Sequence, residues 1–364
     1  MRAVVVAGAI ALLISLFATP LVIRFMTRRS YGQFIRQDGP ESHHVKRGTP
    51  TMGGLVIIGA TVVGWALANI FTVADHKPNI SSLLVLFLMG GLGLVGFLDD
   101  FLKISHERSL GLRARYKILG QAIVGITFAV LALNFPNEAG ITPASTAVSF
   151  LRDTVVDFGA LGGAIGLILF IIWANFLITA WSNAVNLTDG LDGLATGAAV
   201  IFFGAYVLVC LWQLQQKCGF TENVDQCYQV RDPRDLAILC SAIAGACLGF
   251  LWWNTSPAKI FMGDTGSLAL GGAIAGITVL TRTELLGVII GGLFVMVVAS
   301  SVIQIGYFKL SGGKRIFKMA PIHHHFELLG WGQVTIVTRF WIIAGLCAGF
   351  GMAVFYQEFV AQFS

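Results

Sequence analysis

Charged residues are scarce in this chain of 364 residues, at 12% of the sequence. Soluble globular domains carry about a quarter charged residues, so the composition argues against a water-soluble protein. The 56% hydrophobic content excludes intrinsic disorder, because disordered chains contain few apolar residues. The 43 glycines show no three-residue repeat, which excludes collagen, and they fit helices that pack closely within a bilayer.

Long apolar runs take up most of the sequence, and about 20 apolar residues span a bilayer as a helix. The candidate spans are 3–23, 53–73, 81–98, 118–135, 159–181, 194–214, 236–253, 268–280, 285–306 and 339–357. The eighth is short, and either takes residues from the preceding loop or crosses only part of the membrane. These runs predict an all-α, polytopic membrane protein with about ten transmembrane helices and one domain, residues 1–364.

Positive charge gathers on one side of the predicted helices. With ten spans, five loops fall on the same side as Arg28, and together with Arg339 they hold 17 of the 24 Lys and Arg residues. Since Lys and Arg concentrate in cytoplasmic loops, this bias places these loops in the cytoplasm and both termini on the periplasmic side. The five loops are 24–52, 99–117, 182–193, 254–267 and 307–338. A signal peptide is the alternative for the first run, but most of its flanking basic residues follow it.

Asp, Glu, Lys, Arg and His are absent from the ten apolar runs, except for Arg339 at the mouth of the last one. Ion-coupled transporters usually place such a residue near the membrane midplane, so this absence weakens a transporter interpretation. No GxxxxGK[ST] motif occurs, which excludes a P-loop ATPase. A GxGxxG pattern at 91–96 lies within an apolar run rather than between a strand and a helix, so it does not indicate a dinucleotide site.

The five predicted cytoplasmic loops contain the polar, glycine-rich segments, which suggests one composite site. Asp99 and Asp100 are adjacent and repel each other, so a compensating cation is expected nearby. Mg²⁺ binds one or two carboxylates together with phosphate oxygens, and Asp264 lies in a glycine-flanked loop that a ligand could approach closely. The simpler alternative, that Asp99 and Asp100 only cap a helix end, explains less well why Asp189 and Asp192 share the same face.

Basic residues flank these carboxylates. Lys46, Lys103 and Lys117 each lie close to another motif, and we expect them to bind phosphate through charge-assisted hydrogen bonds. Other basic residues, such as Arg113, fit better as topology determinants or contacts to anionic lipids. Three consecutive histidines, His323, His324 and His325, cannot all face one way. We expect one or two of them to contact a phosphate and the others to hold the loop.

Two of the six cysteines lie in the predicted outer loop 215–235. If that side of the membrane is oxidising, Cys218 and Cys227 could form a disulfide. The remaining four lie in spans, where cysteine usually serves as a small packing residue.

From these residues alone, the chemistry is a metal-assisted phosphotransfer that involves a lipid. Five segments go further, because they resemble the signature segments of the polyprenyl-phosphate N-acetylhexosamine-1-phosphate transferases. The segments are Lys46–Gly54, Gly96–Asp100, Asn183–Gly193, Phe261–Gly272 and Pro321–Glu327. The resemblance covers nearly the whole chain, and the first and last segments favour the member that uses UDP-MurNAc-pentapeptide.

This resemblance implies a reaction and a set of roles. UDP-MurNAc-pentapeptide and undecaprenyl phosphate would give lipid I and UMP, in the first membrane step of peptidoglycan synthesis. Asp264 would bind Mg²⁺, Asp100 would lie beside the metal, and Asp99 would orient or deprotonate the lipid phosphate. Residues on the nucleotide side would be Lys46, Thr51, Asn186, Asp189, Asp192, Asn254 and Phe261, the last stacking on uracil. Lys103, Lys117 and His323–His325 would contact phosphate or pyrophosphate.

Several alternatives remain open. The lipid phosphate could attack the UDP-sugar directly, or an Asp could first form a phospho-enzyme. A related transferase that uses UDP-GlcNAc, a transporter of lipid-linked sugars and a non-enzymatic membrane scaffold are the other functions. The resemblance also implies a bacterial inner-membrane protein that forms a homodimer, with its active site facing the cytoplasm, and no nucleic-acid partner is expected.

Overall fold

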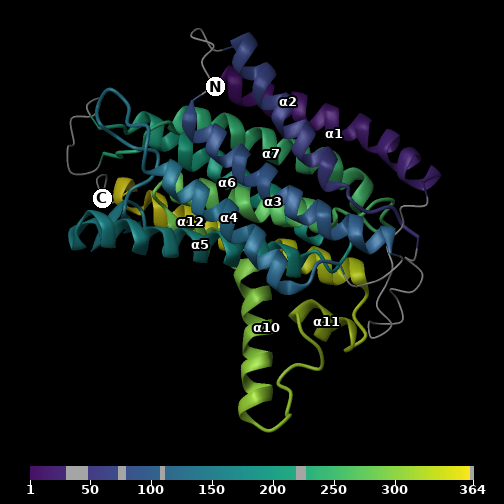
Figure 1. The fold of residues 1–364 in the computed structure, drawn as a ribbon. Coiled ribbons are helices and arrows are strands. Elements are labelled where there is room, and N and C mark those ends of the chain that lie inside the picture. Colours follow the sequence, from purple (N-terminus) through teal and green to yellow (C-terminus); the bar gives the residue numbers. More distant parts are fainter. Residues whose placement is uncertain (30–47, 73–78, 107–110, 219–226, 361–364) are drawn as a thin grey trace.

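Ten helices long and apolar enough to cross a membrane form the body of the molecule in the computed structural model (Figure 1). The structure describes residues 1–29, 48–72, 79–106, 111–218 and 227–360. The ten helices are α1 (Arg2–Arg28), α2 (Gly54–Thr72), α3 (Ile80–Ser105), α4 (Ala114–Ala132), α5 (Gly163–Thr188), α6 (Leu194–Gln215), α7 (Pro233–Asn254), α8 (Gly263–Leu280), α10 (Gly292–Leu310) and α12 (Gln333–Val360). The predicted number of spans is therefore confirmed, and the chain is mostly helical.

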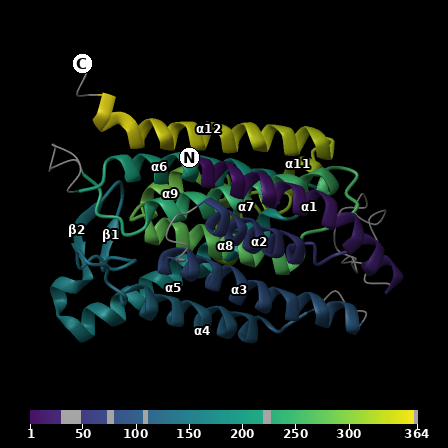
Figure 2. The ribbon, with the colours of Figure 1, turned by 90° about the horizontal axis from the view of Figure 1, so that it is seen from above.

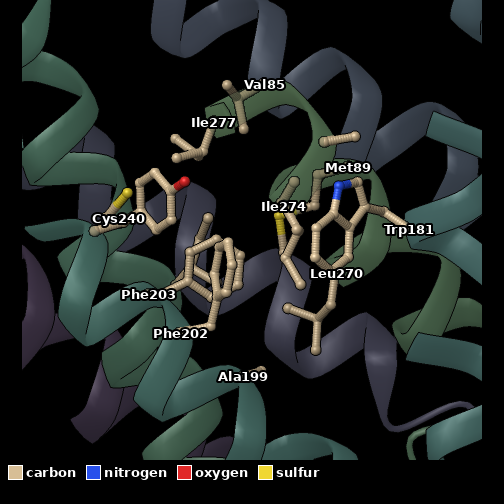
Figure 3. Packing of buried hydrophobic residues seen from close by; sticks show 14 of the residues in the cluster. Val85, Met89, Trp181, Ala199, Phe202, Phe203, Cys240, Leu270, Ile274 and Ile277 are labelled. Carbon is tan, nitrogen blue, oxygen red and sulfur yellow. The ribbon is translucent and has the colours of Figure 1, made fainter. Parts of the chain in front are cut away.

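Helix α8 lies at the centre of the bundle. Every residue from Thr265 to Leu280 is buried, as expected for a helix that is apolar on all sides. Leu270, Ile274 and Ile277 pack against side chains of α3, α5 and α6, including Met89, Trp181 and Phe202 (Figure 3). Glycines allow this close packing, because a Cβ at Gly271 would collide with the backbone of Ser182 on α5. Helix α8 is consequently held in place by neighbouring helices on several sides.

The helices extend into segments that we expected to be loops. Helix α3 continues to Ser105 and α5 to Thr188, so Asp99, Asp100 and Asn186 lie on the last turns of helices. Helix α8 begins at Gly263, and the short eighth run thus takes residues from the preceding loop. Among the described residues, the Asp, Glu, Lys, Arg and His side chains on the ten helices all lie within about two turns of an end.

The ninth run is not one helix. It divides into α9 (Glu284–Ile290) and α10, and Figure 1 shows α10 running steeply away from the other helices. The break falls at the Gly291–Gly292 pair, where helix propensity is low and kinks are common. A Cβ at Gly291 would also meet the indole of Trp181 at 2.5 Å, so only glycine leaves room for that ring.

A short β-hairpin interrupts the helical plan at one end of the bundle, which we call the hairpin end (Figure 2). Strands β1 (Ala147–Ser149) and β2 (Asp153–Asp157) pair antiparallel, and the 3₁₀ helix η2 (Phe158–Leu161) follows. Ser149 donates its N–H to Glu284 at 2.9 Å, and Arg282 pairs with Asp153 at 3.0 Å. The expectation of an all-α chain missed this hairpin, because three- and five-residue strands are too short to give a periodic signal.

The pairing of Cys218 with Cys227 is confirmed, and their Cα atoms lie 4.8 Å apart. Arg152, in the turn of the hairpin, donates to the Cys227 carbonyl at 3.2 Å and lies over the ring of Tyr228. The disulfide is thus tied to the hairpin at the same end of the bundle.

Candidate active site

Three carboxylates from two helices meet at the opposite end, which we call the aspartate end. Asp99 and Asp100 come from the last turns of α3, and Asp264 from the first turn of α8. One ligand atom from each residue can be chosen so that all three lie within 4.8 Å of one another. Asp99 and Asp100 are each only 3% exposed. Buried carboxylates at this separation require positive charge or hydrogen-bond donors nearby.

Asp100 caps the N-terminus of α8. Its Oδ1 accepts the Asp264 N–H at 3.2 Å, and its Oδ2 accepts the Thr265 N–H at 2.9 Å and the Thr265 hydroxyl at 2.8 Å. The first N–H groups of a helix have no partner within the helix, and a negative charge there is favoured by the helix dipole. Asp100 therefore fixes the start of the central helix and with it the position of Asp264. Sequence reasoning considered capping of a helix end by Asp99 and Asp100 only as the simpler alternative, and it could not identify α8 as the capped helix, because α3 and α8 are far apart in the chain.

Two lysines converge on one oxygen of Asp264. Lys103 Nζ lies 3.0 Å from Asp264 Oδ2, and Lys117 Nζ lies 2.7 Å from the same atom. Lys103 also contacts Asp99 Oδ2 at 2.5 Å and Asp100 Oδ1 at 3.8 Å. With all three carboxylates and both ammonium groups charged, the cluster has one net negative charge, so it is able to attract a cation.

Asn186 holds the other oxygen of Asp264. Its Nδ2 donates to Asp264 Oδ1 at 2.6 Å and to Ser267 Oγ at 2.8 Å. Ser267 is fully buried one turn further along α8. Sequence reasoning placed Asn186 on the nucleotide side, whereas the structure brings it into direct contact with the carboxylate cluster. Ser267 was missed, although its spacing of three residues from Asp264 would put both on one helix face.

Asp99 is oriented by the segment just before α4. Leu112 donates its N–H to Asp99 Oδ1 at 2.8 Å. Gly111 lies directly against the carboxylate, since a Cβ on this residue would sit 2.5–2.7 Å from the Asp99 carboxylate atoms. Beyond the Lys103 ammonium, Asp99 Oδ2 has no hydrogen-bonding partner among the described residues. Sequence reasoning missed Gly111 and Leu112, because neither carries a reactive side chain.

The remaining acidic residues of the predicted site lie beside the cluster. Burial raises the pKa of the Asp189 carboxyl above its ordinary value, and the negative charges of Asp264 and Asp100 raise it further. Asp192 is buried, and its Oδ2 accepts the Ala258 N–H at 3.2 Å. The structure therefore joins the Asp189–Asp192 segment to the loop that leads into α8.

The predicted nucleotide-side residues are only partly open to a ligand. Asn254 is buried, with its Oδ1 accepting from Thr196 at 2.9 Å and its Nδ2 donating to the Ile260 carbonyl at 2.9 Å, so it holds the loop before α8. Phe261 is half-buried, and its backbone pairs with Pro50 and Gly53. Thr51 is buried beside Gly263, whereas Lys46 lies outside the described residues.

The three histidines occupy the short helix α11 (Ile322–Glu327) and point to different surroundings. His323 is fully buried, and its Nε2 would collide with a Cβ built on Gly190. His324 Nδ1 lies 2.7 Å from Glu327 Oε2, and His325 Nδ1 accepts the Lys318 N–H at 3.0 Å. The contact at Gly190 brings α11 next to Asp189, so the histidine segment and the acidic segment adjoin.

Comparisons with known proteins agree with this arrangement. Residues 82–282 match the family model "Glycosyl transferase family 4", and residues 46–58 match "Phospho-N-acetylmuramoyl-pentapeptide-transferase signature 1". Proteins named phospho-N-acetylmuramoyl-pentapeptide-transferase from Beutenbergia cavernae and Kineococcus radiotolerans are 66% and 61% identical over 99% of both chains. The protein of that name from Streptomyces griseus subsp. griseus is 58% identical over 100% of both chains. The chain therefore belongs to the phospho-N-acetylmuramoyl-pentapeptide transferases of glycosyl transferase family 4, membrane enzymes of bacterial peptidoglycan synthesis.

Proposed function

We propose that the protein transfers phospho-MurNAc-pentapeptide from UDP-MurNAc-pentapeptide to undecaprenyl phosphate, which yields lipid I and UMP. The observation that carries this proposal is the buried cluster of three aspartates and two lysines at one end of ten apolar helices. Phosphoryl transfer depends on charge neutralisation and positioning more than on a covalent helper. A site at a helix end also allows one substrate to arrive from water and the other from the bilayer.

Magnesium is the cofactor that this donor set fits. Asp99, Asp100 and Asp264 offer oxygen ligands close together, the net charge of the cluster is negative, and Asp99 Oδ2 retains acceptor capacity. Mg²⁺ prefers oxygen ligands and is typically held by one or two carboxylates plus substrate phosphates. When bound, the ion would neutralise charge on the diphosphate of the UDP-sugar. Asp264 and Asp100 would be its main ligands, with Asp100 also keeping its capping role.

Lys103 and Lys117 would bind phosphate oxygens. Both ammonium groups already point to Asp264 Oδ2, so a phosphate bound beside that carboxylate would lie within their reach. Asp99, held by the Leu112 N–H, would orient the lipid phosphate or take its proton. The histidine segment next to Asp189 would contact the same phosphates, and Phe261 would offer its half-exposed ring to uracil.

Direct attack by the lipid phosphate on the β-phosphate of the UDP-sugar is the mechanism that we favour. A phosphate monoester is already an anionic nucleophile, so it needs orientation rather than activation by a covalent intermediate. The alternative begins with attack by an aspartate. Incubation with labelled UDP-MurNAc-pentapeptide in the absence of lipid acceptor, followed by peptide mapping, separates the two. A labelled phospho-sugar on Asp99 or Asp264 would contradict direct attack.

The membrane placement follows from the charges. The bias of Lys and Arg towards the aspartate end favours a cytoplasmic active site and periplasmic termini, in the inner membrane of a bacterium. A homodimer is the expected assembly for this family. Labelling of cysteines introduced at Gly140 and Gly332, at opposite ends of the bundle, would show the orientation in intact cells.

A substrate comparison tests the function. The purified protein is expected to release UMP from UDP-MurNAc-pentapeptide only when undecaprenyl phosphate and Mg²⁺ are both present. UDP-GlcNAc is expected to give no UMP above background under the same conditions. UMP release from UDP-GlcNAc, and not from the pentapeptide substrate, would instead assign the protein to the GlcNAc-1-phosphate transferases. Absence of UMP with both substrates would contradict the proposed reaction.

Gly111→Ala is expected to lower turnover about 10- to 100-fold. The added methyl group would displace the Asp99 carboxylate. A displacement of a catalytic group by about 1 Å can lower the rate by this amount. The KM for UDP-MurNAc-pentapeptide should change little, since the three atoms nearest to the added methyl group all belong to Asp99. Gly332→Ala is the matched control, because its added methyl group meets no atom closer than 4.0 Å. Steady-state kinetics and thermal unfolding of both variants provide the measurement, and equal turnover in the two would contradict the positioning role.

A further inference from the structure

The end of α10 and the loop after it stand apart from the rest of the molecule (Figure 1). We call residues 307–318 the α10 tip. Large apolar side chains are exposed on and just before it, with Leu310 90% exposed, Val302 63% and Ile305 57%. In water such exposure would be unfavourable, so these side chains indicate that α10 lies against lipid.

Basic residues alone supply the charge of the α10 tip. Lys309, Lys314, Arg315 and Lys318 are all exposed, and residues 307–320 contain no Asp or Glu. Within the described part of the chain, none of the four forms an ion pair. The tip is thus a cluster of four unneutralised positive charges mixed with the exposed apolar side chains of Leu310 and Ile316. This combination is typical of a segment that lies at the surface of an anionic bilayer.

Hydrogen bonds connect the α10 tip to the histidine segment, residues 322–327. Gln304 Oε1 accepts the N–H groups of Ile316 and Phe317 at 3.1 and 3.0 Å, and its Nε2 donates to the Phe317 carbonyl at 3.0 Å. Ser300, one turn earlier on α10, accepts the N–H of Ile322 at 3.0 Å. Lys318 donates its N–H to His325. These hydrogen bonds hold the loop and α11 against α10, so a displacement of α10 would also displace the loop and α11.

We propose that the α10 tip binds the headgroups of anionic phospholipids, and that this contact holds the histidine segment in place. The phosphate of the lipid acceptor is the other possible source of negative charge. That phosphate has to reach Asp99 and Asp264 on α3 and α8, whereas Figure 1 places the tip at the end of α10 furthest from those helices. The observations therefore favour the surrounding phospholipid, and this inference adds regulation by lipid to the proposed function.

The test compares two double variants that each remove two exposed charges. Lys314→Gln/Arg315→Gln changes the tip, while Lys309 and Lys318 remain. Arg2→Gln/Arg234→Gln is the control at the hairpin end, where Arg234 lies beside Asp232 and Asp235. Phosphatidylglycerol affinity is measured by native mass spectrometry in neutral detergent, without substrate. Each basic residue near an anionic surface contributes about fivefold in affinity, so the tip variant is expected to bind roughly 25-fold more weakly and the control to be unchanged.

Activity in nanodiscs provides the second readout. Wild type is expected to turn over faster with phosphatidylglycerol present than in neutral phosphatidylcholine, and the tip variant is expected to lose this stimulation while it matches wild type in neutral nanodiscs. Unchanged phosphatidylglycerol affinity in the tip variant, or an equal loss in the control, would overturn the proposal. A higher KM for undecaprenyl phosphate in neutral nanodiscs would assign the tip to the acceptor instead. The phosphatidylglycerol affinity is measured without substrate. A wrong assignment of the lipid site can therefore be distinguished from failure of the proposed reaction.

Discussion

Replacing Asp264 by asparagine is expected to reduce turnover by about 10²- to 10³-fold, which is the range seen when a preorganised charge-stabilising group is removed from an active site. Asp264 is the residue on which the cluster converges, with Lys103 and Lys117 on one oxygen and Asn186 on the other. Asparagine keeps the shape of the side chain but removes its charge. Both ammonium groups would then lose their main partner, and the affinity of the cluster for a cation would fall.

The loss has to be separated from unfolding. Asp232→Asn is the matched control, because Asp232 also pairs with a cation, Arg231 at 2.6 Å, but at the hairpin end. Both variants should elute as folded protein in detergent, and we expect only Asp264→Asn to lose UMP release. Near-normal turnover of a folded Asp264→Asn protein would remove this residue from the mechanism.

Removal of Mg²⁺ is expected to reduce UMP release to background, and addition of Mg²⁺ in excess over the chelator should restore it. The reason is electrostatic, because the cluster already carries net negative charge and the diphosphate of the substrate would add more. The measurement is the initial rate across a Mg²⁺ titration after treatment with EDTA.

A readout without turnover makes this prediction sharper. Mn²⁺ prefers the same oxygen ligands as Mg²⁺. It is also paramagnetic, so its binding can be followed by electron paramagnetic resonance. We expect wild type to bind it and Asp264→Asn to bind it at least tenfold more weakly. Full activity in excess chelator would contradict the metal requirement, whatever the Mn²⁺ result.

The number of spans and the convergence of the polar segments could be predicted from the sequence. Hydropathy over about 20 residues is a strong signal, and ten helices follow the ten runs. Asp99, Asp100 and Asp264 were expected to share one site because their segments fall on the same predicted side. The structure brings them together and adds Lys103, Lys117 and Asn186 to the same cluster.

The connections between segments could not be predicted. The capping of α8 by Asp100 depends on the packing of α3 against α8, which a single sequence does not reveal. Gly111 matters through the space that it leaves for Asp99, and no pattern marks that space. The bend at Gly291 could not be predicted either, because no proline marks it and a glycine pair next to Trp181 is sufficient. In each case a long-range contact decides the local structure.

The three hydrogen bonds that the Asp100 carboxylate accepts at the start of α8 have a consequence for drug resistance. The carboxylate accepts the Asp264 N–H and both the N–H and the hydroxyl of Thr265. A residue that cannot accept these bonds would leave buried donors unpaired, at a penalty of about 1–3 kcal/mol for each. A bacterium that mutated this position to escape an inhibitor would therefore weaken the helix that carries Asp264, so a compound anchored on Asp100 would meet few viable escape mutants.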